Sequence, residues 1–311
     1  MDMSLLPFAA PLTLVLTALL LGFASRRRSP AGAWLAEAGA LLCLALTVTS
    51  VIWLMVAGAG TSLLIGFAGL GFSARLDPLS VTMLVLVAFI GWVVIRYATT
   101  YLVGDSRRES FLAWMALTLA AVLLLVQAGN LPHLVLAWIA TSLALHRLLL
   151  FNPERSGARR AARKKFIVAR IADAALIGAA TLLAIRYQTL DIATILWSAG
   201  VAPERSGMLW PAALLGVAAV LKSAQFPTHG WLTEVMETPT PVSALLHAGV
   251  INAGGFLLIR FADVMVLSPG VLAALVLIGA CTALCAGLIV LTQAAVKTSL
   301  AWSTIAQMGF M

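Results

Sequence analysis

The stretch from Leu215 to Gly255 holds the side chains best suited to moving a charge through apolar surroundings. Lys222 lies about 14 residues into a hydrophobic run that opens near Met208, roughly 21 Å along a helix and close to the middle of a bilayer. An ammonium group at that depth costs about 2.5 kcal/mol or more, so such residues face a protein interior or water and usually belong to an ion path. We therefore predict that Lys222 carries protons or responds to another cation.

A predicted break follows the lysine. Pro227 removes a backbone donor five residues after Lys222, so the helix should end or kink there, and the freed carbonyl groups can line a hydrated cavity. His247 lies about two turns into the next predicted helix, which opens at Pro241. A lysine and a histidine at comparable depth on adjacent helices can exchange protons, because both lose their charge readily outside water.

A second charged pair lies in the sequence KKFIVARIADAAL. Arg170 and Asp173 are spaced i, i+3 and so share one face of a helix. Paired charges are cheaper in a membrane than single ones, so the pair can be purely structural. Alternatively, it tunes the charge state of Lys222. The sequence leaves both interpretations open.

Two further titratable residues belong to the candidate set. His146 is the one titratable residue at depth in the run 131–151. Lys297 opens the last run, VKTSLAWSTIAQMGFM, where it either extends the polar line beyond His247 or anchors the helix at the cytoplasmic interface.

The composition requires that membrane helices position these residues. Hydrophobic residues make up 62% of the 311-residue chain, charged residues 10%, and the mean hydropathy is +1.03, which excludes a soluble globular protein. We predict an all-α, polytopic transmembrane bundle with nine complete helices and a tenth begun. The apolar runs are 5–25, 33–57, 78–102, 110–128, 131–151, 164–187, 208–232, 241–262, 270–292 and 297 onward.

Two smaller features concern how these helices connect and pack. The glycine-rich connection from Gly58 to Pro78 is predicted to be an ordered loop or a short hairpin. Gly249, Gly254 and Gly255 are predicted to let a neighbouring helix approach closely.

Basic residues set the predicted orientation. Eleven of them fall in alternate connections and four in the opposite ones, so the positive-inside rule places the N-terminus outside. The pI of 10.1 reflects these anchors, and nucleic-acid binding is not predicted. The predicted cytoplasmic residues are Arg26, Arg27, Arg28, Arg107, Arg108, Arg155, Arg159, Arg160, Arg163, Lys164 and Lys165; the outer ones are Arg75, Arg186, Arg205 and Arg260.

The sequence contains no motif for a cofactor or metal. Cys43, Cys281 and Cys285 lie within apolar runs without CxxC spacing and are predicted to be buried small side chains. GxGxxG and P-loop patterns are absent. We therefore predict a transporter subunit rather than an enzyme, with no cofactor in this chain.

Several segments resemble the antiporter-like membrane subunits shared by respiratory complex I and the Mrp antiporters. They are KSAQFPTHGWLTEVMETPTPVSALLHAG from Lys222, RLDPLS, FIVARIAD and VKTSLAWSTIAQMGF, in the family's order. The resemblance implies that Lys222 is the central proton-carrying lysine of a broken seventh helix. It implies a relay role for His247 and makes Lys297 the lysine at the start of helix ten.

The resemblance also implies a division of the chain. The family has two inverted five-helix repeats, here predicted as N-terminal helices over 1–103, a complete first repeat over 104–264 and the start of a second over 265–311. Met311 has no polar tail, so we expect a truncated product.

One position departs from the family's pattern. Its proton pumps carry a glutamate after the tryptophan of helix five, which pairs with the central lysine, whereas Ile139 follows Trp138 here. His146, seven positions on and on the same face, could replace that glutamate only after a shift of about two turns.

The text ATSLALHRLLLFNPERSGARRAARKKFIVARIADAAL, with LLHAGVINAGGFLLIRFADVM, resembles instead the DabB subunits of bacterial inorganic carbon transporters. This implies an inner-membrane subunit whose proton or sodium flow energises uptake of CO2 as bicarbonate. The zinc would belong to a peripheral DabA partner. The alternative is a proton-pumping subunit of complex I or an Mrp-type cation/proton antiporter.

Overall fold

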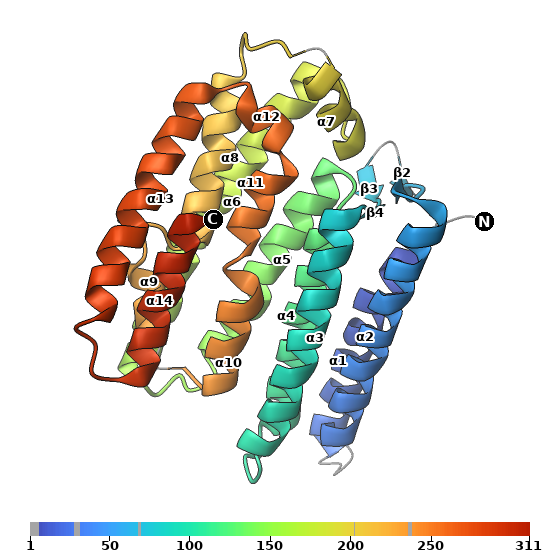
Figure 1. Cartoon of the computed structure of the whole chain (residues 1–311). Coiled ribbons are helices and arrows are strands. Elements are labelled where there is room, and N and C mark those ends of the chain that lie inside the picture. The colour runs from blue at the N-terminus through green and yellow to red at the C-terminus, as the bar shows by residue number, and fades with distance from the viewer. Residues whose placement is uncertain (1–5, 28–31, 68–69, 202, 236–237) are drawn as a thin grey trace. The chain divides into compact units, whose positions relative to one another are not determined.

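The computed structural model describes residues 6–27, 32–67, 70–201, 203–235 and 238–311. The predicted all-α bundle is confirmed, with four short strands as the only exception among these residues (Figure 1). Arg28, one of the predicted cytoplasmic residues, lies outside the described residues. The chain forms two compact units, Met1–Phe151 with Thr240–Gly249, and Asn152–Pro239 with Val250–Met311.

The first unit is built around α4. This helix is buried along most of its length and packs against α1, α3 and α5, while α2 contacts both α1 and α3. The short α10 packs on α3. The helices of this unit are α1 (Leu6–Arg27), α2 (Gly32–Ala57), α3 (Pro78–Tyr101), α4 (Arg108–Val126), α5 (Leu131–Leu149) and α10 (Thr240–Leu245).

Short antiparallel strands connect α2 to α3, which confirms the predicted hairpin. Strand β1 (Gly60–Thr61) pairs with β4 (Arg75–Leu76), and β2 (Ile65–Phe67) pairs with β3 (Leu70–Phe72). Asp77 then caps α3: its Oδ1 accepts a hydrogen bond of 2.8 Å from the Ser80 amide.

The second unit is centred on α8. Helix α6 packs along α8 and also contacts α9. Helices α11 and α13 lie against α8, and α14 packs along α13 (Figure 1). Its helices are α6 (Ser156–Tyr187), α7 (Ile192–Val201), α8 (Leu209–Lys222), α9 (Gly230–Glu234), α11 (Ala253–Arg260), α12 (Ala262–Val266), α13 (Pro269–Val290) and α14 (Val296–Phe310).

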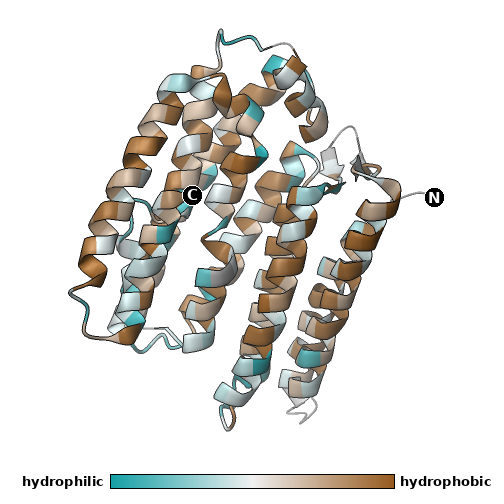
Figure 2. Ribbon diagram, viewed as in Figure 1, coloured by the Kyte–Doolittle hydropathy of each residue, from teal (hydrophilic) through white to brown (hydrophobic). Residues whose placement is uncertain are grey.

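The described part of the chain contains seven helices long and apolar enough to cross a membrane, so this is a multi-pass membrane protein. Figure 2 shows apolar residues along most of α13 and hydrophilic residues in several of the connections. The long helices are α1 to α6 and α13.

The run 208–232 divides into α8 and α9, as the break predicted after Lys222 requires. Two other expectations about helices were wrong. The run 241–262 is not one continuous helix but consists of α10, a π-helix (Leu246–Val250) and α11. The short apolar α7 was not predicted. The predicted repeat boundaries at 103 and 264 stay a prediction.

Helix α6 begins about two turns before the predicted residue 164. Ala158, Ala161 and Ala162 are buried on one side of this extension, while Arg159 and Arg160 are exposed on the other. Alanine is the best helix former, and this amphipathic pattern continues the buried face of the apolar part. The basic residues therefore belong to the helix and not to a loop.

Candidate ion-transfer site around Lys222

Helix α8 ends at Lys222, and the predicted break is confirmed. The Gln225 amide donates to the Val220 carbonyl over 3.1 Å, the long closing bond of a Schellman motif. Ala224 between them has a φ of 51°, the left-handed conformation that this motif requires. The chain resumes as α9 only at Gly230, after Pro227. Helix termination at the lysine thus has a local cause in addition to the proline.

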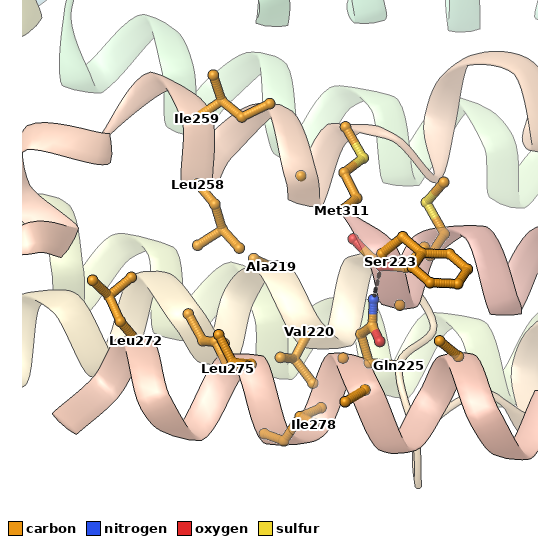
Figure 3. A pocket seen from close by; sticks show the side chains of 18 of the residues that line it. Ala219, Val220, Ser223, Gln225, Leu258, Ile259, Leu272, Leu275, Ile278 and Met311 are labelled. Carbon is orange, nitrogen blue, oxygen red and sulfur yellow. Dashed lines mark hydrogen bonds between the residues drawn. The ribbon is translucent and has the colours of Figure 1, made fainter. Parts of the chain in front are cut away.

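Two hydrogen bonds fasten the break to neighbouring helices. The Phe226 amide donates to Thr282 Oγ1 on α13 over 3.0 Å, and the Gln225 Nε2 donates to the Met308 carbonyl on α14 (Figure 3). A cavity of about 780 Å³ lies beside this segment. Its lining is mainly apolar, with Ser223 and Gln225 as polar members, as the labelled side chains in Figure 3 illustrate.

The lysine itself is 6% exposed and lies against α6. It interacts electrostatically with Asp173, which attracts it, and with Arg170, which repels it. These three residues, which the sequence analysis connected as one interpretation, lie together within the second unit, and their role stays a prediction. A buried ammonium beside one carboxylate is the arrangement by which an apolar interior tolerates a charge.

The Arg170–Asp173 pair forms as the i, i+3 spacing predicts. Arg170 Nη2 lies 2.6 Å from Asp173 Oδ2, and the Asp173 side chain is 6% exposed against 34% for Arg170. The guanidinium also lies over the Phe166 ring, 5.1 Å from its centroid. This carboxylate therefore has Arg170 and Lys222 among its cationic partners.

Lys165 is the functional candidate that the sequence reasoning missed. It was assigned to the cytoplasmic anchors, but it is 5% exposed and interacts electrostatically with Lys222, Asp173 and Arg170. The signal was present in the sequence: Ala161 and Ala169, at i−4 and i+4, put Lys165 on the buried face of α6.

Three further predicted relay residues belong to other helices. His146, half-buried on α5, and His247, half-buried in the π-helix, belong to the first unit. Lys297 is half-buried at the start of α14, where its Nζ donates to the Thr238 carbonyl over 2.9 Å. Their roles in proton transfer stay predictions.

Two smaller expectations were wrong. Arg260, expected in an outer connection, is 4% exposed at the end of α11, and its guanidinium lies 5.2 Å from the centroid of the Phe256 ring. Cys281 is exposed and Cys285 half-buried, because both lie on the open side of α13; only Cys43 is buried.

No metal-binding group was found among the described residues: nowhere in them do three or more His, Cys, Asp or Glu side chains gather. The site around Lys222 consists of amino, guanidinium and carboxylate groups. In apolar surroundings the amino and carboxylate groups can hold and pass on a proton, whereas a guanidinium keeps its own.

Comparisons with known proteins agree with this architecture. Residues 128–311 match the family described as NADH:quinone oxidoreductase/Mrp antiporter, TM, and residues 63–112 match the N-terminus of NADH-ubiquinone oxidoreductase (complex I) chain 5. A solved Mrp complex from Dietzia sp. DQ12-45-1b contains a chain with 30% identity and a TM-score of 0.86; the match covers 98% of this chain and 33% of that one.

Similar curated proteins are inorganic carbon transporter subunits. The probable DabB of Hydrogenovibrio crunogenus is 45% identical over 76% of this chain and 46% of the relative. The probable DabB2 of Halothiobacillus neapolitanus is 43% identical over 83% of this chain and 47% of the relative. The chain thus spans about half the length of these relatives. Since the matched family covers well over half of the chain, the protein belongs to the NADH:quinone oxidoreductase/Mrp antiporter family of membrane proteins.

Proposed function

We propose that this chain is a cation-translocating membrane subunit that energises inorganic carbon uptake. The observation that carries the proposal is Lys222: it is 6% exposed, at the end of an interrupted helix, and beside the Arg170–Asp173 pair. A buried lysine in a membrane bundle is costly, and a site that keeps one has a use for its charge. The translocated cation is a proton or sodium.

The carbon substrate follows from the relatives. The similar curated proteins are named as probable inorganic carbon transporter subunits, DabB and DabB2. We assign CO2 and bicarbonate to this chain's system on that basis, with the zinc on a DabA-type peripheral partner. The host membrane is then the inner membrane of a bacterium, with the N-terminus outside.

The second candidate is a proton-pumping subunit of complex I or of an Mrp-type antiporter. It is supported by the family match over 128–311 and by the likeness to a chain of the solved Mrp complex. Ile139, which follows Trp138 on α5, argues against it, because an isoleucine cannot pair with Lys222 as the glutamate of the resembling pumps does. We therefore place it second.

Growth of a bacterium without its own carbonic anhydrases tests the proposal. The strain would carry the gene for this chain, with any sequence that follows it, together with a DabA-type partner, and would be grown in ordinary air. Rescue by the parent and by Lys164→Ala, but not by Lys222→Ala, would support it. Lys164 is a suitable control because its side chain is 52% exposed. Absence of rescue from an expressed, assembled complex would favour the antiporter candidate.

A further inference from the structure

Lys165 and Lys164 are adjacent in sequence but lie in opposite environments. The Lys164 side chain is 52% exposed and pairs with Glu234 on α9. Lys165 is 5% exposed and continues a stripe of buried small residues along α6. Lysine is almost never fully buried unless its charge has partners, so a role for Lys165 as a membrane anchor is excluded. The stripe consists of Ala158, Ala161, Ala162, Ala169, Ala172 and Ala179.

The partners of Lys165 create an excess of positive charge. Lys222 on α8 and Arg170 on its own helix repel it, and Asp173 attracts it. We call Lys165, Arg170, Asp173 and Lys222 the lysine cluster. When both of its lysines are protonated, this cluster holds three cations and one carboxylate where α6 packs on α8. Arg170 keeps its proton at any usable pH. Two ammonium groups repel each other strongly in such surroundings, so the two lysines are coupled and favour sharing one proton over holding two.

Lys165 lies on α6 between Asp173 and the end of the helix that is predicted to face the cytoplasm. It is eight residues nearer the N-terminal end of α6 than Asp173, about 12 Å along the helix axis. That end exposes Arg159, Arg160 and Arg163, which the positive-inside pattern assigns to the cytoplasm. Lys165 is thus a buried titratable group that lies nearer this helix end than Asp173 does.

We propose that Lys165 is the cytoplasm-side proton-exchange partner of Lys222. This rests on the proposed function and adds a second protonatable residue to it. In the exchange, an Nζ–H bond of one lysine breaks, and the lone pair of the other lysine's neutral amine takes the proton. One positive charge moves between α6 and α8, and no other bond changes. Asp173 attracts both lysines and so stabilises the single shared charge.

The test measures proton flux into liposomes that contain the complete complex, with a pH-sensitive dye. Lys165→Met keeps the length and apolar fit of the side chain but removes the amine, so we expect the flux to fall by about a hundredfold. With Lys165→Arg the flux should fall by as much, because arginine keeps the charge but cannot release the proton. Lys164→Ala is the matched control and should stay within about twofold of the parent, since exposed ion pairs contribute little.

A fourth variant separates proton exchange from a structural role. Lys165→His retains a titratable group that loses its proton at lower pH than lysine, so part of the flux should return, with an optimum shifted toward acid. A purely structural lysine would not move the optimum. This variant also decides the matter where Lys165→Met fails to assemble.

The outcomes distinguish the two proposals. If Lys222→Ala abolishes flux while Lys165→Met and Lys165→Arg behave like Lys164→Ala, Lys165 is not in the path, although the translocation proposal stands. If the assembled parent complex moves no protons and no sodium, both proposals are wrong. If Lys165→Arg pumps at the parent's rate, the lysine supplies only charge and the exchange step is overturned.

Discussion

Arg170 and Asp173 form a 2.6 Å ion pair one turn apart on α6, and Asp173 is at the same time the attractive partner of Lys222 on α8. One carboxylate thus serves both of these cations, and it also attracts Lys165. This arrangement leaves two roles for the pair, support of the helix packing or adjustment of the charge on Lys222. The first prediction separates these roles.

Asp173→Asn should lower the free energy of unfolding by about 2 kcal/mol, less than for a fully buried pair because Arg170 is 34% exposed. Unfolding in detergent would measure this. The double variant Arg170→Gln with Asp173→Asn should lose less than the sum of the single variants. If the double variant regains stability but not ion flow, the pair adjusts the charge on Lys222. If it regains both stability and ion flow, the pair has only a structural role.

Under the proposed function, Lys222→Arg should abolish carbon uptake although it preserves the positive charge. Arginine does not release its proton at usable pH, so a step that requires a neutral amine stops. Uptake of labelled inorganic carbon, compared with the parent and with Lys222→Ala, measures the effect, with a loss of about a hundredfold or more expected. Parental uptake by the arginine variant would exclude proton carriage by this residue.

The helix break at Lys222 and the Arg170–Asp173 ion pair could be predicted from the sequence because their causes are local. A charged residue in an apolar run and a proline five residues later are both visible without tertiary structure, and α8 does end at Lys222. The i, i+3 spacing of Arg170 and Asp173 is equally local. These features required only helix geometry and the cost of a charge in a membrane.

Three parts of the structure were missed, each for its own reason. Lys165 was counted among the cytoplasmic charges, because a count of basic residues cannot separate a buried lysine from its exposed neighbour Lys164. The π-helix that contains His247 follows from packing and has no signature in LLHAGV. Helix α7 was missed because its ten residues are too short for a search based on bilayer length.

Thr282→Val should destabilise the segment after Lys222. Thr282 is fully buried, and its Oγ1 accepts the Phe226 amide over 3.0 Å while donating to the Ile278 carbonyl. Valine has nearly the same shape but leaves this amide without its acceptor, at an expected cost of about 2 kcal/mol. Thermal unfolding in detergent would report it, together with reduced ion flow.

Thr181→Val on α6 is the matched control for that substitution. Thr181 Oγ1 donates only to the Ile177 carbonyl of its own helix, at an exposed position. We expect a change below about 0.5 kcal/mol. Equal effects of the two valines would mean that the hydrogen bond to Phe226 does not stabilise the break.

Gly254→Ala should disturb the contact between α11 and α8. An added Cβ would lie 2.5 Å from the Ala219 carbonyl oxygen and also collide with Ser223 Oγ, so the close approach predicted for this glycine is confirmed. Gly249, by contrast, has no such neighbour within 4 Å, and the prediction was wrong there. Because a backbone oxygen cannot move aside, we expect the free energy of unfolding to fall by about 1–3 kcal/mol and the ion flow to weaken.

Gly287→Ala on α13 is the control for Gly254→Ala. Its Cβ would meet nothing within 4 Å, and alanine should stabilise that helix by roughly 0.5–1 kcal/mol. If both alanines stabilise the protein in detergent, α11 and α8 are not held as close as the structure places them.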